Sequence, residues 1–271
     1  MLFVEANGAR IPAIGLGTWE LRGRTCARIV EQALRLGYRH IDTAQMYANE
    51  AEVGEGVRAS GKRAEVMVTT KVAHGSLAPH ELERSVKDSL HKLRLDIIDL
   101  LLIHWPNERV PLAETLGAMA KAKREGYVKQ IGVSNFTVAL LDEAMKTTSE
   151  SIVCNQIEYH PFLDQTKVIA ACKKHGIAVV AYSPIARGSA QGDAVLEKIG
   201  MAHNKSAAQV SLRWLVRQSV IVIPRTSKVR RLEENLSIFD FALSAQEMAE
   251  IGALVQRGKR IVDLAHAPKW D

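Results

Sequence analysis

The chain has few cysteines and nothing that resembles a secretory signal or a membrane span. Cys26, Cys154 and Cys172 are an odd number with no close pair, which fits reduced core thiols better than a disulfide framework or a zinc site. The first residues, MLFVEANGARIPAIG, have no basic start and no sustained apolar region, so we expect no signal peptide. No apolar run approaches the roughly 20 residues that cross a bilayer. We therefore expect a cytoplasmic protein without membrane contact.

A concentrated basic surface is also missing. The net charge is +6, and apart from Lys228 to Arg231 the basic residues are scattered along the chain. A nucleic-acid-binding protein usually gathers its positive charge on one face, with aromatic residues between the cations. The charge distribution therefore argues against nucleic acid and favours a small anionic ligand.

The pattern of the chain predicts alternating strands and helices. The expected strands are residues 14–17, 38–42, 66–71, 97–104, 130–134, 153–158, 178–182 and 220–223. The expected helices are residues 25–36, 49–60, 80–93, 112–125, 138–146, 164–175, 194–202, 206–217, 228–236 and 244–255. Capping boxes open two of these helices, Ser206 with Gln209 and Ser244 with Glu247. A small hairpin is expected at residues 4–11, and the tail after Arg260 is expected to be irregular.

Eight strand–helix units predict a (β/α)₈ TIM barrel of the α/β class, with an N-terminal hairpin and two extra helices. A doubly wound sheet also alternates strands and helices. However, the segment after the first strand, GLGTW, lacks the third glycine of a dinucleotide-binding fingerprint. With 47% hydrophobic residues, the chain can bury a large core without disulfides or metal. We expect residues 1–271 to form one domain.

Polar residues follow the apolar strands at the point where each strand ends, which is where barrels of this kind hold their chemistry. Asp42 ends the second strand, Lys71 the third and His104 the fourth, and Tyr47 lies five residues beyond Asp42. A lysine at the end of a buried strand must be paired, form a Schiff base or stay unprotonated. Asp42 is the obvious partner for Lys71.

An ammonium beside a phenol lowers the pKa of that phenol, so we expect Lys71 to lower the pKa of Tyr47. His104 can donate a hydrogen bond to a substrate carbonyl oxygen. Together these groups predict a general acid aimed at an oxygen that becomes negative in the transition state. Taken singly, Asp42, Tyr47 and His104 each also fit a purely structural role. A metal site built from His104, His160 and Asp42 has no ligand spacing to support it.

Several long motifs, in order, carry a resemblance to a known family. They are GLGTW, YRHIDTAQMYANEAEVGEG, TTK, LRLDIIDLLLIHWP, GVSNF, NQIEYHP, AYSP and IPRTSKVRRLEENL. The chain resembles the aldo-keto reductases from Gly15 through Asn235. Within that family, including the closing APKWD, it is most similar to the bacterial 2,5-diketo-D-gluconate reductases. Eight segments in the right order are far more specific than one short motif.

The resemblance implies a catalytic set of Asp42, Tyr47, Lys71 and His104, with Tyr47 donating a proton while NADPH gives hydride to the carbonyl carbon. It implies that Ser134, Asn135 and Gln156 hold the nicotinamide carboxamide and that Tyr182 stacks on the ring. The adenosine end would lie at the segment after the last strand, where two arginines and a hydroxyl suit a 2′-phosphate. The full set of implied cofactor residues is Ser134, Asn135, Gln156, Tyr182, Ser183, Arg187, Arg225, Thr226, Arg231, Glu234 and Asn235.

The pocket for the carbonyl substrate is expected to be lined by Trp19, Tyr47, His104 and Trp105. His74 and Trp270 are further candidates from their location alone. The loops at residues 106–111 and 185–193 are short compared with those of many relatives, so the resemblance implies an open site and loosely held NADPH. Arg187 stands where many relatives carry serine, and two roles are open to it, namely contact with the pyrophosphate or simple solvation.

Three function classes follow, with NADPH-dependent reduction of aldehydes or activated ketones by a monomer as the first. A non-catalytic NADPH-binding barrel is the second, although a full catalytic set argues against it. The third is a lyase or aldolase that uses Lys71 as a Schiff base. It is disfavoured because Asp42 would hold that lysine protonated.

Overall fold

Eight parallel strands form one sheet whose neighbours follow the order of the chain from the first strand to the last. The computed structural model describes residues 2–258 and 260–271. The strands of this sheet are β3 (Leu16–Gly17), β4 (His40–Asp42), β5 (Met67–Val72), β6 (Ile98–Ile103), β7 (Val128–Ser134), β8 (Ile152–Glu158), β9 (Ala178–Tyr182) and β10 (Ile221–Val222). Sequential parallel neighbours need a crossover each, and helices supply it.

The sheet closes on itself through the segments that flank its two shortest strands. Ile14 pairs with Val222 and Gly17 with Arg225, both in parallel bridges. The backbone N–H of Gly15 donates to the Val222 carbonyl at 2.8 Å. Gly17 is required here because a Cβ at this position would lie 2.6 Å from the carbonyl oxygen of Ile223. The predicted eight-stranded barrel is therefore confirmed.

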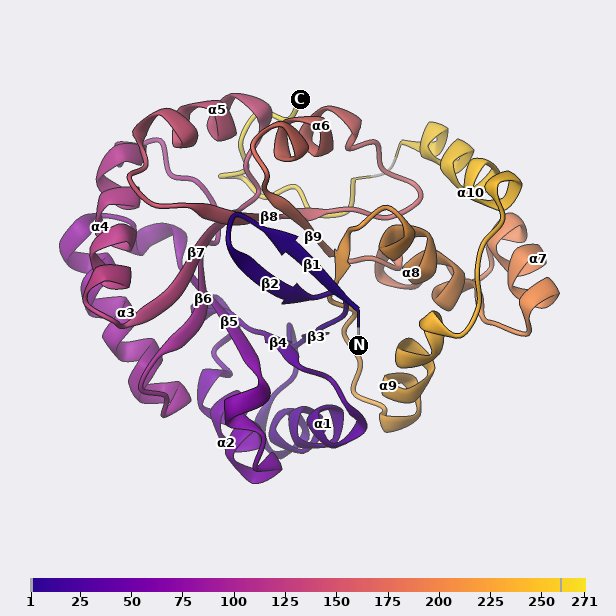
Figure 1. Ribbon diagram of the computed structural model, residues 1–271, viewed down its shortest axis with the longest axis horizontal. Helices are drawn as coiled ribbons and strands as arrows, with labels where there is room; N and C mark the ends of the chain where they lie inside the picture. The colour runs from indigo at the N-terminus through magenta and orange to yellow at the C-terminus, as the bar shows by residue number, and fades with distance from the viewer. Residues whose placement is uncertain (1, 259) are drawn as a thin grey trace.

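Ten α-helices surround the barrel in the part of the chain that the structure describes (Figure 1). They are α1 (Gly23–Leu36), α2 (Glu50–Ser60), α3 (Pro79–Leu93), α4 (Leu112–Arg124), α5 (Val138–Thr147), α6 (Thr166–Lys174), α7 (Ala194–His203), α8 (Ala207–Arg217), α9 (Val229–Leu236) and α10 (Ala245–Gly252). Both predicted capping boxes are present, at Ser206 and at Ser244. The last predicted helix ends earlier than expected and continues as a 3₁₀ turn over Ala253–Arg257.

The buried strands divide their side chains between two apolar clusters. In β6, Leu101 and Ile103 belong to the large cluster beneath the helices, and Leu100 and Leu102 belong to a smaller cluster inside the barrel. This alternation is what a strand covered on both faces produces. The inner cluster also contains Ile11 from the hairpin, so the hairpin closes one end of the barrel.

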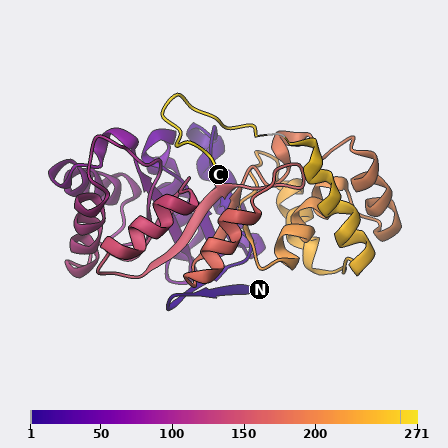
Figure 2. The ribbon, with the colours of Figure 1, turned by 90° about the horizontal axis from the view of Figure 1, so that it is seen from above.

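The hairpin and the C-terminal segment lie at opposite ends of the barrel (Figure 2). The hairpin consists of β1 (Phe3–Ala6) and β2 (Ala9–Pro12), paired antiparallel. Residues 260–271 have no regular secondary structure, as predicted, and cross the opposite end. None of the described helices combines the length and the apolar character that a bilayer crossing requires. The three cysteines are buried and unpaired, as the sequence predicts.

Candidate active site

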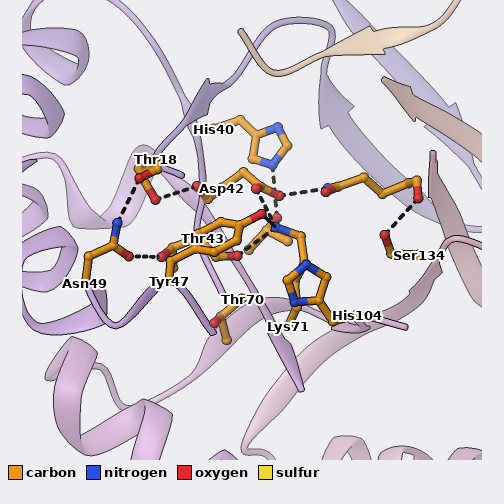
Figure 3. Close-up of polar contacts among 12 residues, drawn as sticks. Thr18, His40, Asp42, Thr43, Tyr47, Asn49, Thr70, Lys71, His104 and Ser134 are labelled. Carbon is orange, nitrogen blue, oxygen red and sulfur yellow. Dashed lines mark hydrogen bonds and ion pairs between the residues drawn. The ribbon is translucent and has the colours of Figure 1, made fainter. Parts of the chain in front are cut away.

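The side chains predicted at the strand ends point toward one another (Figure 3). Asp42 is the last residue of β4, Lys71 lies near the end of β5 and His104 directly follows β6. Tyr47 comes from a 3₁₀ turn, Gln45–Tyr47, in the loop after β4. Parallel strands bring their carboxyl ends to one edge, which explains how residues far apart in sequence meet here.

A buried ion pair forms the floor of the site. Lys71 Nζ lies 2.5 Å from Asp42 Oδ1, and the two side chains are 0% and 2% exposed. The same ammonium donates to the Thr43 carbonyl at 2.9 Å and lies 3.3 Å from the Tyr47 hydroxyl. The three contacts use the three N–H groups of the ammonium, so no donor is left over. The predicted pairing of Lys71 with Asp42 is confirmed.

The electrostatics of this floor keep Lys71 charged. Burial lowers the pKa of Lys71, but Asp42 and Tyr47 together raise it, and the net direction is upward. A lysine held as an ammonium is a poor nucleophile, because nucleophilic attack needs the free amine. The geometry therefore argues against a Schiff-base enzyme.

The pKa of Tyr47 does not move in the direction expected from the sequence. Burial raises this pKa, and that effect outweighs Lys71, which lowers it as predicted. The loss of hydration destabilises the buried phenolate by more than the Lys71 ammonium at 3.3 Å stabilises it. Tyr47 consequently carries its proton and is a donor, which is the form that a general acid needs.

His104 is held in its neutral form. Burial lowers its pKa well below the ordinary value, and Lys71 adds to the effect. Its ring lies edge-on to that of Tyr47, with 5.6 Å between the ring centroids. A neutral imidazole has one N–H to donate and carries no charge that would compete with Tyr47 as a proton source. The Nδ1 atom is buried and has no hydrogen-bond partner among the residues that the structure describes.

A second chain of hydrogen bonds links the strands that follow. Gln156 Nε2 donates to Asp42 Oδ2 at 2.8 Å, so this carboxylate accepts bonds on both oxygens. Asn135 Nδ2 donates to the His104 carbonyl at 2.9 Å, and the Tyr182 hydroxyl donates to Asn135 Oδ1 at 2.8 Å. These contacts fix the amide groups that the family resemblance implies for the cofactor, and they tie these amides to the residues around Lys71.

The site opens into a cleft of about 580 Å³. All four predicted substrate residues line it. Eight of the predicted cofactor residues also line it, and these are Ser134, Asn135, Gln156, Tyr182, Ser183, Arg187, Arg225 and Arg231. The structure therefore brings the predicted carbonyl and cofactor residues into one continuous space.

The other predicted cofactor residues lie outside the cleft wall. Thr226 is buried and accepts a hydrogen bond from the backbone N–H of Lys228. Glu234 pairs with Arg230 at 2.9 Å. Asn235 lies in α9, and its side chain does not line the cleft. Any role of these residues toward a cofactor stays a prediction.

Two arginines frame the cleft around Trp19. The guanidinium of Arg187 lies over the Trp19 ring, 4.6 Å from its centroid, and Arg225 Nε donates to the Trp19 carbonyl at 3.2 Å. Arg187 is exposed to solvent and at the same time stacks on Trp19 at the cleft, so both of its expected roles stay open. The backbone here is strained, with left-handed φ values of 49° at Ser183 and 51° at Arg187. Strain of this kind is concentrated at functional sites.

Two candidate pocket residues do not line the cleft but surround it. His74 stacks on His266 with 4.4 Å between ring centroids, and Trp270 lies edge-on to Trp105 at 6.2 Å. Trp270 thus packs directly against Trp105, and His74 is linked to it through His266, whose ring lies edge-on to Trp105 at 5.5 Å. Two cleft residues that the sequence did not suggest, Val262 and Leu264, come from the C-terminal segment. An irregular tail gives no periodic signal that would have placed them.

Asn49 is a further residue whose role sequence reasoning missed. Asn49 directly precedes α2 as its N-cap residue, but its side chain makes no cap hydrogen bond. Instead Nδ2 donates to the carbonyls of Thr18 and Leu21, at 2.8 and 3.1 Å, and Oδ1 accepts from the Thr43 hydroxyl at 2.6 Å. This fully buried amide joins the loops after β3 and β4, which carry Trp19 and Tyr47.

We expect Asn49→Ala to lower the free energy of unfolding by roughly 3 kcal/mol, because it leaves buried carbonyl and hydroxyl groups without partners. Thermal denaturation should show a melting temperature lower by about 5–10 °C. Asn49→Asp keeps the acceptor for Thr43 but has no N–H for the two carbonyls, so it should lose a similar amount. An unchanged melting temperature in both variants would contradict this role.

The comparisons with known proteins agree with this geometry. The model of the aldo/keto reductase family matches residues 13–256. Methylglyoxal reductase DkgB of Escherichia coli O157:H7 is 42% identical over 265 residues, which cover 96% of this chain and 99% of that protein. The glyoxal reductase of Bacillus subtilis is 40% identical over 250 residues, covering 92% of this chain and 90% of that protein.

Solved structures give the same result. A crystal structure provisionally assigned as a 2,5-diketo-D-gluconic acid reductase B superposes with a TM-score of 0.98 at 46% identity, covering 100% of this chain and 98% of that one. The aldose reductase of Schistosoma japonicum superposes with a TM-score of 0.93 at 32% identity, covering 98% of this chain and 96% of that one. The chain belongs to the aldo/keto reductase family and is an oxidoreductase that reduces carbonyl groups.

Proposed function

We propose that this protein reduces small aldehydes and activated ketones to alcohols with NADPH, with Tyr47 as the proton donor. The observation that carries the proposal is the position of the Lys71 ammonium, which contacts both the Asp42 carboxylate and the Tyr47 hydroxyl at the floor of the cleft. Members of the family typically use NADP(H).

The residues of the cleft fit a nicotinamide dinucleotide phosphate. One part presents amides and a hydroxyl from Gln156, Asn135 and Ser134, which suit a carboxamide. Another part presents the guanidinium groups of Arg225 and Arg231, which suit phosphate oxygens. When bound there, NADPH supplies a hydride to the carbonyl carbon.

The protein's own part is to position the carbonyl oxygen and to deliver a proton to it. The neutral imidazole of His104 orients the oxygen by donating a hydrogen bond. Tyr47 then donates its hydroxyl proton to the oxygen as negative charge develops there. Lys71 stabilises the resulting phenolate at 3.3 Å, and Asp42 in turn holds Lys71 in the charged form.

The substrate class is proposed from the relatives and from the shape of the site. Relatives at 40–42% identity carry the names methylglyoxal reductase and glyoxal reductase. Aromatic side chains, Trp19, Trp105 and Tyr47, line the cleft beside the polar floor. We propose dicarbonyls and keto-sugars as the preferred substrates, because their second oxygen makes the reacting carbonyl more electrophilic.

The test is loss of NADPH absorbance with a panel of methylglyoxal, glyoxal, a diketo-sugar acid and an aromatic aldehyde. We expect turnover with the dicarbonyls and the highest kcat/KM within that group. Tight NADPH binding without turnover of any carbonyl would contradict the proposal and favour a non-catalytic binding barrel. Borohydride trapping of a substrate on Lys71 without nicotinamide would favour the lyase alternative.

We also propose that the chain acts as a single domain, as a monomer and in a reducing compartment. The continuous barrel from β3 to β10 supports one domain. The three buried, unpaired thiols support a reducing compartment. Gel filtration with light scattering tests the monomer.

A further inference from the structure

Residues 260–271, here called the C-terminal strap, cross the barrel end that holds the site (Figure 2). The strap has no helix or strand, so its backbone N–H groups find no partners within regular structure. Two of its residues, Val262 and Leu264, line the cleft. Whatever fixes the start of the strap therefore also fixes part of the cleft wall.

The start of the strap is held by a fully buried carboxylate, Glu158, at the end of β8. Glu158 Oε1 accepts from the backbone N–H of Ile261 at 2.7 Å, and Oε2 accepts from that of Val262 at 2.8 Å. His160 Nε2 lies 3.0 Å from Oε1, and both side chains are 0% exposed. The carboxylate thus joins a barrel strand to a segment more than 100 residues away.

The hydrogen-bond pattern suits an ionised carboxylate, whose two oxygens can only accept. A backbone N–H can only donate, so both oxygens of Glu158 must accept. His160 Nδ1 accepts from the backbone N–H of Phe162 at 3.3 Å, which places the imidazole proton on Nε2, facing Glu158. All three neighbours therefore donate. Hydrogen bonds to a charged acceptor are stronger than neutral ones, which makes this a firm attachment.

Glu158 is also directly connected to the site. It lies two residues beyond Gln156 on β8, and it pairs in register with Tyr182 of β9. The far end of the strap is attached separately, since the Asp271 carboxylate accepts from the backbone N–H of Val138 at the first residue of α5. The strap is thus fastened at both ends, with the cleft residues beside the Glu158 end.

We propose that Glu158 is a positioning residue for the carbonyl site, which fastens the strap so that Val262 and Leu264 form a fixed wall of the cleft. The proposal rests on the proposed function, because it takes this cleft as the place where the carbonyl substrate binds. If the wall is already ordered before the substrate binds, binding does not include the entropic cost of ordering the wall. Loss of the attachment should therefore weaken binding more than chemistry.

Glu158→Gln is the matched test, because it keeps the size of the side chain but sets an N–H₂ group against a strap N–H. Hydrogen exchange, measured by mass spectrometry, should be at least about tenfold faster at residues 260–264. For methylglyoxal, KM should rise about tenfold, with kcat changed by less than about twofold. The Kd for NADPH, measured without substrate, serves to separate cofactor binding from substrate binding.

Asp99→Asn is the control. Asp99 is another buried carboxylate, 7% exposed, that accepts from the Val68 N–H at 3.0 Å but lies on β6 away from the strap. The Asp99→Asn variant should have a lower free energy of unfolding, but its backbone amides at residues 260–264 should exchange no faster than in the native protein. Should Glu158→Gln not fold, Ile261→Pro removes one strap donor to Glu158 without changing a side chain of the cleft wall, and the same effects are expected.

Unchanged exchange in the strap would overturn the proposal, and so would faster exchange with an unchanged KM. Absence of turnover in the native protein would instead contradict the proposed function. Hydrogen exchange needs no turnover, so it would still decide whether Glu158 holds the strap.

Discussion

Tyr47→Phe is expected to lower kcat by about 10³-fold or more, because it removes the only proton that Tyr47 can deliver and leaves the ring in place. The ring contacts of Tyr47 with His104 and Lys71 do not need the hydroxyl. Lys71 keeps two partners, Asp42 and the Thr43 carbonyl, so the ion pair survives the change. Single-turnover reduction of methylglyoxal measures the loss, and NADPH affinity should stay within about twofold of the native value.

Tyr159→Phe is the matched control for this experiment. Tyr159 is also buried, and its hydroxyl donates to Gln218 at 3.2 Å outside the cleft. The same loss of one hydroxyl should leave kcat nearly unchanged there. Appreciable reduction by Tyr47→Phe would show that another group, with His104 the nearest candidate, supplies the proton.

The barrel could be predicted from the sequence because its signals are repeated. Every predicted strand has a counterpart in the sheet, and the almost unbroken apolar run at 97–104 becomes β6, buried along its whole length. The sequence predicts the ends of strands less precisely, since the strand expected at 38–42 begins only at His40. The particular contacts that close the barrel could not be predicted from the sequence, because they depend on two-residue strands and on isolated bridges such as that of Gly17 with Arg225.

The candidate site was predictable where a polar residue directly follows an apolar strand. Lys71 and His104 are the clearest cases, since a buried lysine must find a partner and Asp42 was the obvious choice. The pKa of Tyr47 was not predictable, because its direction depends on how burial balances a contact at 3.3 Å. The attachment of the strap to Glu158 could not be predicted either, because its donors are backbone N–H groups, which almost every residue has whatever its side chain.

Arg231→Ala is expected to raise the Kd for NADPH by roughly 30- to 100-fold and the Kd for NADH by less than about threefold. Arg231 lies in the first turn of α9, its side chain is exposed, and it lines the cleft together with Arg225. The two dinucleotides differ only in the 2′-phosphate. A guanidinium that binds this group stabilises one cofactor and not the other, because guanidinium groups pair with phosphate oxygens bidentately.

Arg230→Ala is the matched control, because Arg230 precedes Arg231 in the same turn but pairs with Glu234 at 2.9 Å and is 89% exposed. Arg230→Ala removes one positive charge from the same end of α9. It therefore measures how much of the weaker NADPH binding comes from the general electrostatic field of this basic turn. That field is screened by salt, whereas direct contact with a phosphate is screened less. We therefore expect the ratio of the Kd values for NADH and NADPH to stay close to the native ratio in Arg230→Ala at about 0.15 M salt, and to fall strongly in Arg231→Ala.

An equal loss of affinity for NADPH and NADH in Arg231→Ala would place the 2′-phosphate elsewhere, with Arg225 as the remaining cation of that part of the cleft.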